Sequence, residues 1–228
     1  MPRSILWRVW DAVKPPPPVP ARRRLNRAQR RLLRITAILL ALGASSWGIY
    51  AFIASAPERA HSHYQRGMRL LGPGDFEGAA AELTKAIAIV PRYADAYLGR
   101  GKARQAAGQS DAALADFEKA IAIDPTLEAA FTASGVVRRD RRDFQNALAD
   151  FTRSIRLHPT ADAHYQRGLT YQMLGQAQSA ARDYDLAIEL DPSAPYSYRA
   201  RAKARGDLGD TAGAREDQEK ADRVERTR

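Results

Sequence analysis

The longest apolar stretch of the chain runs from Ile35 to Ala54 and contains no charged residue in twenty positions. A helix rises about 1.5 Å per residue, so this run is long enough to cross the roughly 30 Å hydrocarbon core of a membrane. The pattern predicts one transmembrane helix over residues 35–54. The alternative is a signal peptide cleaved after Ala56, but the run exceeds the usual length of roughly 7–15 residues. Pro57 would also follow the cut.

Two shorter patterns precede this run. Apolar residues such as Ile5, Val9 and Val13 form one stripe and predict a short amphipathic helix over residues 1–14 that lies in the membrane interface. The alternatives are a disordered tail or a docking helix for a partner in a membrane complex. The prolines from Pro15 onward end that helix, and residues 15–34 form a Pro-rich and then Arg-rich juxtamembrane segment.

The formal net charge of +10 comes almost entirely from residues 1–34, which hold ten basic residues and one acidic residue. The rest of the chain is nearly neutral, which argues against nucleic acid as the partner. The Arg-rich side is expected to stay cytoplasmic and to attract anionic lipid headgroups. We therefore expect a single-pass protein of the bacterial inner membrane, with a periplasmic C-terminal domain; a mitochondrial membrane is the alternative. The residues expected to contact the membrane or its lipids are Trp7, Trp10, Arg30, Arg31, Arg34, Trp47 and Tyr50.

From Ala60 onward the pattern of apolar and small residues repeats with a period of 33 or 34. A proline closes each unit, a glycine stands 24 positions earlier, and a large side chain stands 8 positions earlier. The three sets are Pro91, Pro125, Pro159 and Pro192; Gly67, Gly101, Gly135 and Gly168; and Leu83, Phe117, Phe151 and Tyr184. The pattern predicts that each unit forms two antiparallel helices that pack closely at the glycine. The turn between them is expected at Gly74, Gly108 or Gly175, and the second helix is expected to end before the proline.

These residues resemble the tetratricopeptide-repeat family over Ala60–Arg228. Four repeats cover residues 60–93, 94–127, 128–160 and 161–194, and a fifth at 195–228 ends in a mostly charged helix suited to cap a solenoid. The resemblance implies an all-α fold, a right-handed superhelix of helix pairs. It also implies a concave groove lined by the first helix of each pair, which would bind a protein or peptide.

The resemblance places a set of candidate binding residues in that groove. They are Tyr64, Met68, Leu98, Lys102, Val136, Arg139, Tyr165, Leu169, Tyr196 and Arg199. Neighbouring groove positions are His61, Leu71, Asp95, Gln105, Ala129, Thr132, Asp162, Gln172 and Lys203. The mixture of apolar and basic side chains favours a partner with apolar anchors and some acidic character.

A second candidate site is a basic run at the turn of the third repeat. Its members are Arg138, Arg139, Arg141 and Arg142. This run is either a solvated turn or an anchor for an acidic partner or lipid headgroup.

No pattern predicts an enzyme. The chain has no cysteine, no phosphate-binding glycine loop and no nucleophile elbow, and His61, His63, His158 and His164 do not converge in sequence. We expect no cofactor, metal or small-molecule substrate. The expected function is a membrane-tethered scaffold or assembly factor that binds other proteins. The alternative is a permanent accessory subunit of a respiratory, photosynthetic, secretion or envelope complex.

Overall fold

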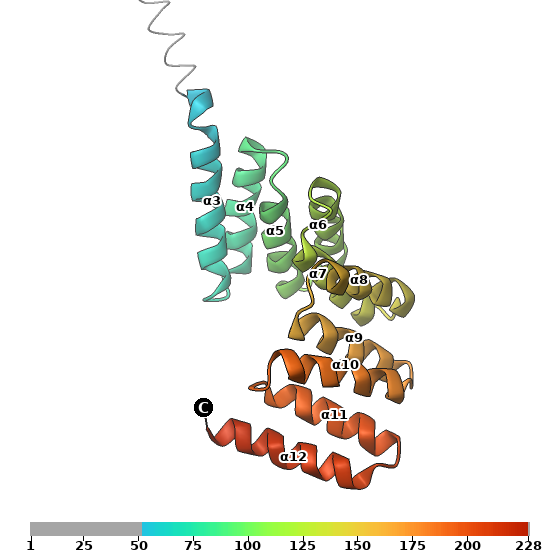
Figure 1. The fold of residues 1–228 in the computed structure, drawn as a ribbon. Coiled ribbons are helices and arrows are strands. Elements are labelled where there is room, and N and C mark those ends of the chain that lie inside the picture. Colours follow the sequence, from blue (N-terminus) through green and yellow to red (C-terminus); the bar gives the residue numbers. More distant parts are fainter. Residues whose placement is uncertain (1–51, 228) are drawn as a thin grey trace, which may run out of the picture. The chain divides into compact units, whose positions relative to one another are not determined.

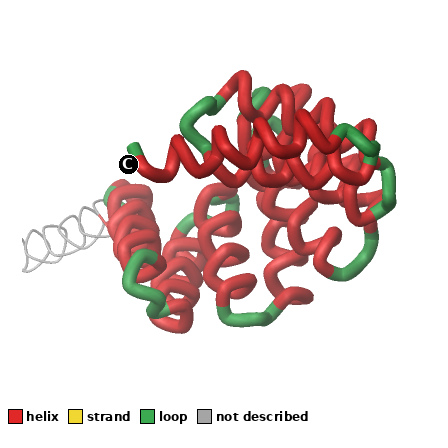
Figure 2. Tube along the Cα trace, turned by 90° about the horizontal axis from the view of Figure 1, so that it is seen from below, coloured by secondary structure: helices red, strands yellow, loops and turns green. Residues whose placement is uncertain are grey.

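The computed structural model describes residues 52–227, which fold into ten helices joined by short loops, without any strand in this range (Figures 1 and 2). The helices are α3 (Ala56–Leu71), α4 (Phe76–Ile89), α5 (Ala94–Ala106), α6 (Ser110–Ile123), α7 (Glu128–Asp140), α8 (Phe144–Leu157), α9 (Ala161–Met173), α10 (Ala177–Leu190), α11 (Pro195–Asp207) and α12 (Thr211–Arg226). The predicted all-α solenoid is confirmed for this part of the chain.

The N-terminal elements expected from the sequence fall on residues 1–51, outside the described residues. They are the interfacial helix, the juxtamembrane segment and all but the last three residues of the expected transmembrane helix. Within residues 52–227, none of the helices is both long enough and apolar enough to cross a membrane.

The helices associate in chain order. Each odd-numbered helix packs against the next even-numbered one, and each even-numbered helix also contacts the first helix of the following pair. First helices contact one another in the series α3, α5, α7, α9 and α11. No two second helices of the described part are in contact with each other. The first helices therefore share one face of the repeat array.

The expected packing of glycine against a large side chain holds each of the first four pairs together. A Cβ atom built on Gly67 would lie 2.6 Å from Cγ of Leu83, and one on Gly168 would lie 2.6 Å from Cε1 of Tyr184. Phe117, Phe151, Leu83 and Tyr184 are fully buried. Since no side chain fits at these crossings, the glycines allow the two helices of a pair to approach.

Helix ends also follow the repeat pattern. α4, α6, α8 and α10 each end two residues before the proline that closes their repeat, because the residue before a proline avoids helical geometry. The turns inside the pairs need a left-handed residue, and Gly74, Gly108, Gly175 and Gly209 supply it with φ between 72° and 85°. In the third pair Arg142 holds the same conformation at φ 64°.

Replacing Arg142 by glycine is expected to raise the free energy of unfolding by about 1 kcal/mol, because a left-handed conformation costs a residue with a Cβ roughly that much. Urea unfolding of the full chain would measure the change. Arg141→Gly is the matched control: Arg141 has a φ of −83°, so glycine there relieves no strain. It adds freedom to the unfolded chain and removes the exposed ion pair with Asp111, and both effects should lower stability. A stabilisation by Arg141→Gly as large as that by Arg142→Gly would contradict the assignment of strain to residue 142.

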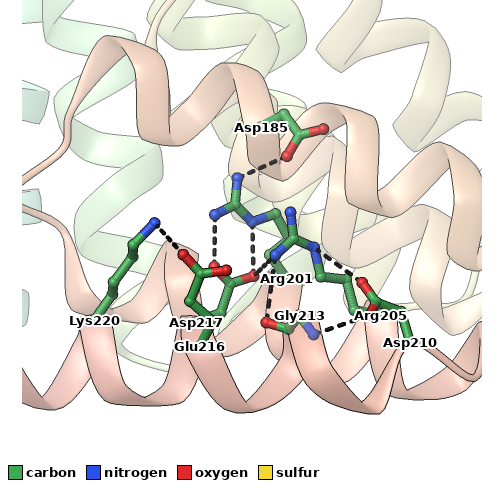
Figure 3. Close-up of polar contacts among 8 residues, drawn as sticks. All are labelled: Asp185, Arg201, Arg205, Asp210, Gly213, Glu216, Asp217 and Lys220. Carbon is green, nitrogen blue, oxygen red and sulfur yellow. Dashed lines mark hydrogen bonds and ion pairs between the residues drawn. The ribbon is translucent and has the colours of Figure 1, made fainter.

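A buried acidic residue in the second helices forms a further layer of contacts that the hydropathy pattern does not reveal. Asp183 accepts two hydrogen bonds from Arg167 at 2.8 and 2.7 Å. Asp217 is held in the same way by Arg201 at 2.8 and 2.6 Å, and Arg205 approaches it at 3.0 Å (Figure 3). Asp116 is held by Arg100 and Arg104, and Asp150 by Ser134 and Arg138. Each first helix from α5 onward is thereby fixed to its second helix.

Four of these arginines also reach back to the preceding repeat. Arg201 donates to Asp185 on α10 at 2.7 Å, as Figure 3 shows, and Arg138 donates to Glu118 on α6 at 2.9 Å. Arg100 donates to Thr84, and Arg167 donates to Thr152. We call Arg100, Arg138, Arg167 and Arg201 the bridging arginines, because each joins two adjacent repeats.

The pKa values of the buried acids of the third and fourth repeats shift in opposite directions. Burial raises the pKa of Asp150, and the hydrogen bonds from Ser134 and Arg138 only partly oppose it. Burial also acts on Asp183, but the hydrogen bonds and charges of Arg167 and His164 together outweigh it and lower the pKa of that carboxyl. The difference arises because the third repeat has Ser134 where the others have arginine.

Asparagine at these two positions is therefore expected to change the pH dependence of stability in opposite directions. Asp183 has a folded pKa below its unfolded value of about 3.9, so its stabilisation is present above that pH and is lost as the pH falls through the folded pKa. Asp150 has a folded pKa above that value, so its contribution is fully present at low pH and is lost as the pH rises through the folded pKa.

Urea unfolding between about pH 3 and pH 7 would test this expectation, with pH 3 below the pKa of about 3.9 that an aspartate has in the unfolded chain. As the pH rises, the loss of stability caused by Asp183→Asn should grow. The stability of Asp150→Asn should instead increase relative to that of the unmodified chain over the same pH range. Parallel curves for the two variants would show that the two carboxyls titrate alike.

Candidate partner-binding groove

Two cavities open along the face that the first helices share. The first, of about 490 Å³, lies between α5, α7 and α9. Its lining residues are Lys102, Gln105, Glu128, Ala129, Thr132, Ala133, Val136, Thr160 and Asp162. The second, of about 350 Å³, lies between α7, α9 and α11. Its lining residues are Arg139, Asp140, Leu169, Gln172, Met173 and Lys203. We call this face, with both cavities, the groove.

The walls of the groove combine an apolar part with charges of both signs. Ala129, Ala133 and Val136 form an apolar strip on α7 in the first cavity. In the second, Leu169 lies one helical turn before Met173, whose side chain is 55% exposed. Surfaces of this kind bind the side chains of a peptide in small pockets and leave its backbone polar groups near polar residues.

The groove carries acidic side chains beside the apolar and basic ones that the sequence predicts. Lys102 shares the first cavity with the carboxylates of Glu128 and Asp162. In the second cavity Asp140 accompanies Arg139 and Lys203, and it accepts hydrogen bonds from Arg139 at 3.0 and 3.2 Å. The described walls of the two cavities thus carry as many acidic as basic side chains. Two of the acids, Glu128 and Asp162, lie in the first turns of α7 and α9.

Four of the ten predicted groove residues line the cavities: Lys102, Val136, Arg139 and Leu169. They come from α5, α7 and α9, so the structure brings three repeats together at one site. Arg139 also donates to Gln166 on α9, which fixes its guanidinium beside the second cavity.

The four tyrosine and methionine candidates lie beside other aromatic or apolar groups. Tyr165 meets Tyr196 edge-on, with ring centroids 4.8 Å apart, and burial raises the pKa of Tyr165. Tyr196 is 42% exposed and offers an accessible aromatic surface next to the second cavity's helices. Tyr64 packs against Tyr93 at 5.2 Å, and a Cβ on Gly99 would lie 3.0 Å from Sδ of Met68.

The last two candidates have structural partners of their own. Leu98 is only 8% exposed and belongs to the core between α5, α6 and α7. Arg199 donates two hydrogen bonds to Glu225 of α12, at 2.8 and 2.5 Å. Neither residue lines one of the two cavities.

The basic run at the third turn is largely neutralised within the fold. Arg138 is paired with Asp150 and Glu118, Arg139 with Asp140, and Arg141 with Asp111. Among the described residues no ion pair of Arg142 occurs. The geometry therefore favours a solvated turn with one available guanidinium over an anchor made by four.

Some lining residues were not among the sequence-based candidates. Met173 follows Leu169 by one helical turn, so helical periodicity alone could have identified it. Glu128 and Thr160 lie at or just before the start of a first helix, where the repeat pattern predicts no orientation. The seven residues expected to contact membrane or lipid lie outside the described residues. No cluster of His, Asp and Glu suited to a metal ion occurs within residues 52–227.

Comparison with known proteins defines the repeats. Residues 94–127 and 161–194 match the family model described as tetratricopeptide repeat, and residues 73–108 match a second model described as TPR repeat. The chain therefore carries tetratricopeptide repeats, and their helix pairs are those of the solenoid described above. No curated protein sequence matches the chain significantly.

Solved structures support the same fold. A crystal structure of MamA is 26% identical, with a TM-score of 0.64, and the match covers 71% of this chain and 95% of MamA. PilF of Pseudomonas aeruginosa gives a TM-score of 0.70 at 19% identity, covering 75% of this chain and 78% of PilF. TTC0263, a thermophilic TPR protein of Thermus thermophilus, gives a TM-score of 0.60 at 21% identity, and the match covers 71% of this chain and 89% of TTC0263. The last two similarities, at their low identity, establish the fold alone.

Proposed function

We propose that this protein is a membrane-anchored scaffold or assembly factor that binds a segment of another protein in the groove. The observation that carries the proposal is that side chains from successive repeats line two adjacent cavities on one face of the solenoid. Tetratricopeptide-repeat domains bind protein partners, and solenoids of this kind use an extended inner surface to do so. An enzymatic role has no support among the described side chains.

The membrane anchor in this proposal rests on the uncharged run over residues 35–54. Phe52 and Ile53, its last large apolar residues, are 62% and 63% exposed. α3 begins at Ala56, directly after the run, so partners are expected at or near the membrane. The arginines before the run favour a cytoplasmic N-terminus, contact with anionic lipid headgroups and a periplasmic repeat domain at a bacterial inner membrane.

The test is affinity purification of the full chain from its native membrane in mild detergent, followed by mass spectrometry. Val136→Asp and Leu169→Asp place a charge in the first and second cavity, respectively. Leu186→Asp is the matched control, because Leu186 is 41% exposed on the second helix α10 and lines neither cavity. Each groove variant should lower recovery of the specific partners at least about tenfold, since a desolvated charge in an apolar contact costs more than about 1.4 kcal/mol.

Unchanged recovery with both groove variants would contradict the proposal. Among supporting outcomes, the stoichiometry distinguishes two forms of the function. Substoichiometric partners indicate a scaffold or assembly factor, whereas a fixed set of membrane subunits indicates a permanent accessory subunit of a larger complex.

A further inference from the structure

Four residues at the same repeat position form a row across the groove. Lys102 on α5, Val136 on α7, Leu169 on α9 and Lys203 on α11 are separated by 34, 33 and 34 positions, the spacing of the repeat itself. Lys102 and Val136 line the first cavity, and Leu169 and Lys203 line the second. We call these four residues the groove row. Its order across the two cavities is basic, apolar, apolar, basic. Met68 on α3 holds the same position one repeat earlier and lines neither cavity.

The two lysines of the row have no carboxylate partner in residues 52–227, and both are exposed. This distinguishes them from the nearby arginines, since Arg139 is held by Asp140 and Gln166, and Arg199 by Glu225. An ammonium group at the mouth of a cavity with no partner in its own fold is available to a carboxylate of a bound chain.

The acidic residues of the groove occupy a different line. Glu128 and Asp162 lie in the first turns of α7 and α9, where the helix dipole favours a negative charge. Asp162 precedes Leu169 by seven residues, which corresponds to about 10 Å along a helix axis. Glu128 and Asp162 therefore follow one edge of the groove, and the row crosses the helices about two turns further along. The third acid, Asp140, lies at the other end of α7, where it is paired with Arg139.

We infer that the groove binds an extended acidic peptide in which two carboxylate side chains flank an apolar stretch. This inference deepens the proposed function and rests on it. First helices in contact lie about 8–10 Å apart, so three intervals separate Lys102 from Lys203 by roughly 25–30 Å. An extended chain covers about 3.3 Å per residue, which places the two acidic residues about eight positions apart. Val136 and Leu169 contact the apolar side chains between them.

The experiment is selection of a randomised twelve-residue peptide library on the full chain in lipid nanodiscs, in parallel on three forms of the protein. The first is the unmodified chain, and the second is the double variant Lys102→Glu with Lys203→Glu. The control is Lys119→Glu, which changes an exposed lysine on α6 that lines neither cavity and has no ion pair in the described chain.

Peptides selected on the unmodified chain and on the control should carry Asp or Glu at two positions about eight apart, with apolar residues between. Peptides selected on the double variant should carry Lys or Arg at those positions instead. A synthetic acidic peptide from the first selection should bind the double variant at least about tenfold more weakly, by fluorescence anisotropy, because like charges now face each other.

Two results would overturn the inference in distinguishable ways. If the unmodified chain and the double variant select the same sequences, and these lose binding on Val136→Asp or Leu169→Asp, the groove binds peptides without reading their charge. The inference then fails and the proposed function stands. If no peptide is enriched, or if all variants bind the selected peptides equally, both the inference and the proposed groove fail.

Discussion

Replacement of Asp183 by alanine is expected to lower the free energy of unfolding by about 3 kcal/mol, the lower end of what removing one partner of a buried ion pair costs. The side chain of Asp183 is 4% exposed, and its carboxylate accepts hydrogen bonds from Arg167 and His164. Without it the guanidinium of Arg167 keeps only its hydrogen bond to Thr152 in a half-buried position. Urea unfolding of the full chain, followed by far-ultraviolet circular dichroism, would measure the loss.

The matched control for this variant is Asp185→Ala, two residues further along α10. Asp185 also accepts from an arginine, Arg201, but its side chain is 54% exposed. Exposed ion pairs contribute about 1 kcal/mol or less. An Asp183→Ala loss no larger than that of the control would show that burial adds nothing to the pairing in this layer.

Alanine at Gly101 is expected to destabilise the fold by about 2 kcal/mol, although alanine is the better helix former by nearly 1 kcal/mol. The added methyl group would overlap the ring of Phe117, and both residues are fully enclosed between α5 and α6. The neighbouring helix would have to move away or the ring would have to leave its rotamer. The shift in the midpoint of urea unfolding measures the effect.

Gly206 provides the opposite case within the same fold. It lies in α11, and a Cβ built on it meets no atom within 4 Å. Gly206→Ala should therefore raise the free energy of unfolding by up to about 1 kcal/mol, as helix propensity predicts. Changes of the same sign at Gly101 and Gly206 would refute the role of the glycine crossings.

The solenoid could be predicted from sequence because its determinants recur at fixed positions. A glycine such as Gly168 and a large side chain such as Tyr184 form a pair in every full repeat, and periodicity detects such a pair without knowledge of the fold. The buried ion pairs were missed for a different reason. Arg167 and Asp183 are 16 residues apart and both polar, so the hydropathy pattern assigns both to the surface.

A signal for these pairs was nevertheless present in the repeat frame. The residue before the repeat glycine is Arg66, Arg100 or Arg167 in three of the four full repeats, and the ninth residue before each closing proline is acidic. Two opposite charges that recur in register on the two helices of one pair indicate a contact. The polar positions of the repeat, and not only its apolar ones, therefore carry information about the contacts between its two helices.

The groove was predictable as a face and not as a set of binding side chains. The period places Arg199 and Lys203 on the same helix, one turn apart, and sequence alone treats them alike. Glu225 of α12 binds Arg199, while Lys203 is left at the cavity. Which cation is available depends on how the last helix packs, and this is a property of the tertiary structure.

The bridging arginines make the same kind of contact between each pair of adjacent repeats from the first to the fifth. Arg167 reaches Thr152 in the repeat before it, and Arg201 reaches Asp185 at the corresponding position one repeat later. Excision of residues 161–194 would thus bring Arg201 to the position where Arg167 now meets Thr152, with a hydroxyl acceptor in place of a carboxylate. Gene duplication or deletion in whole units can accordingly lengthen or shorten this protein without new joints having to evolve, and the reach of its binding face would change in steps of one repeat.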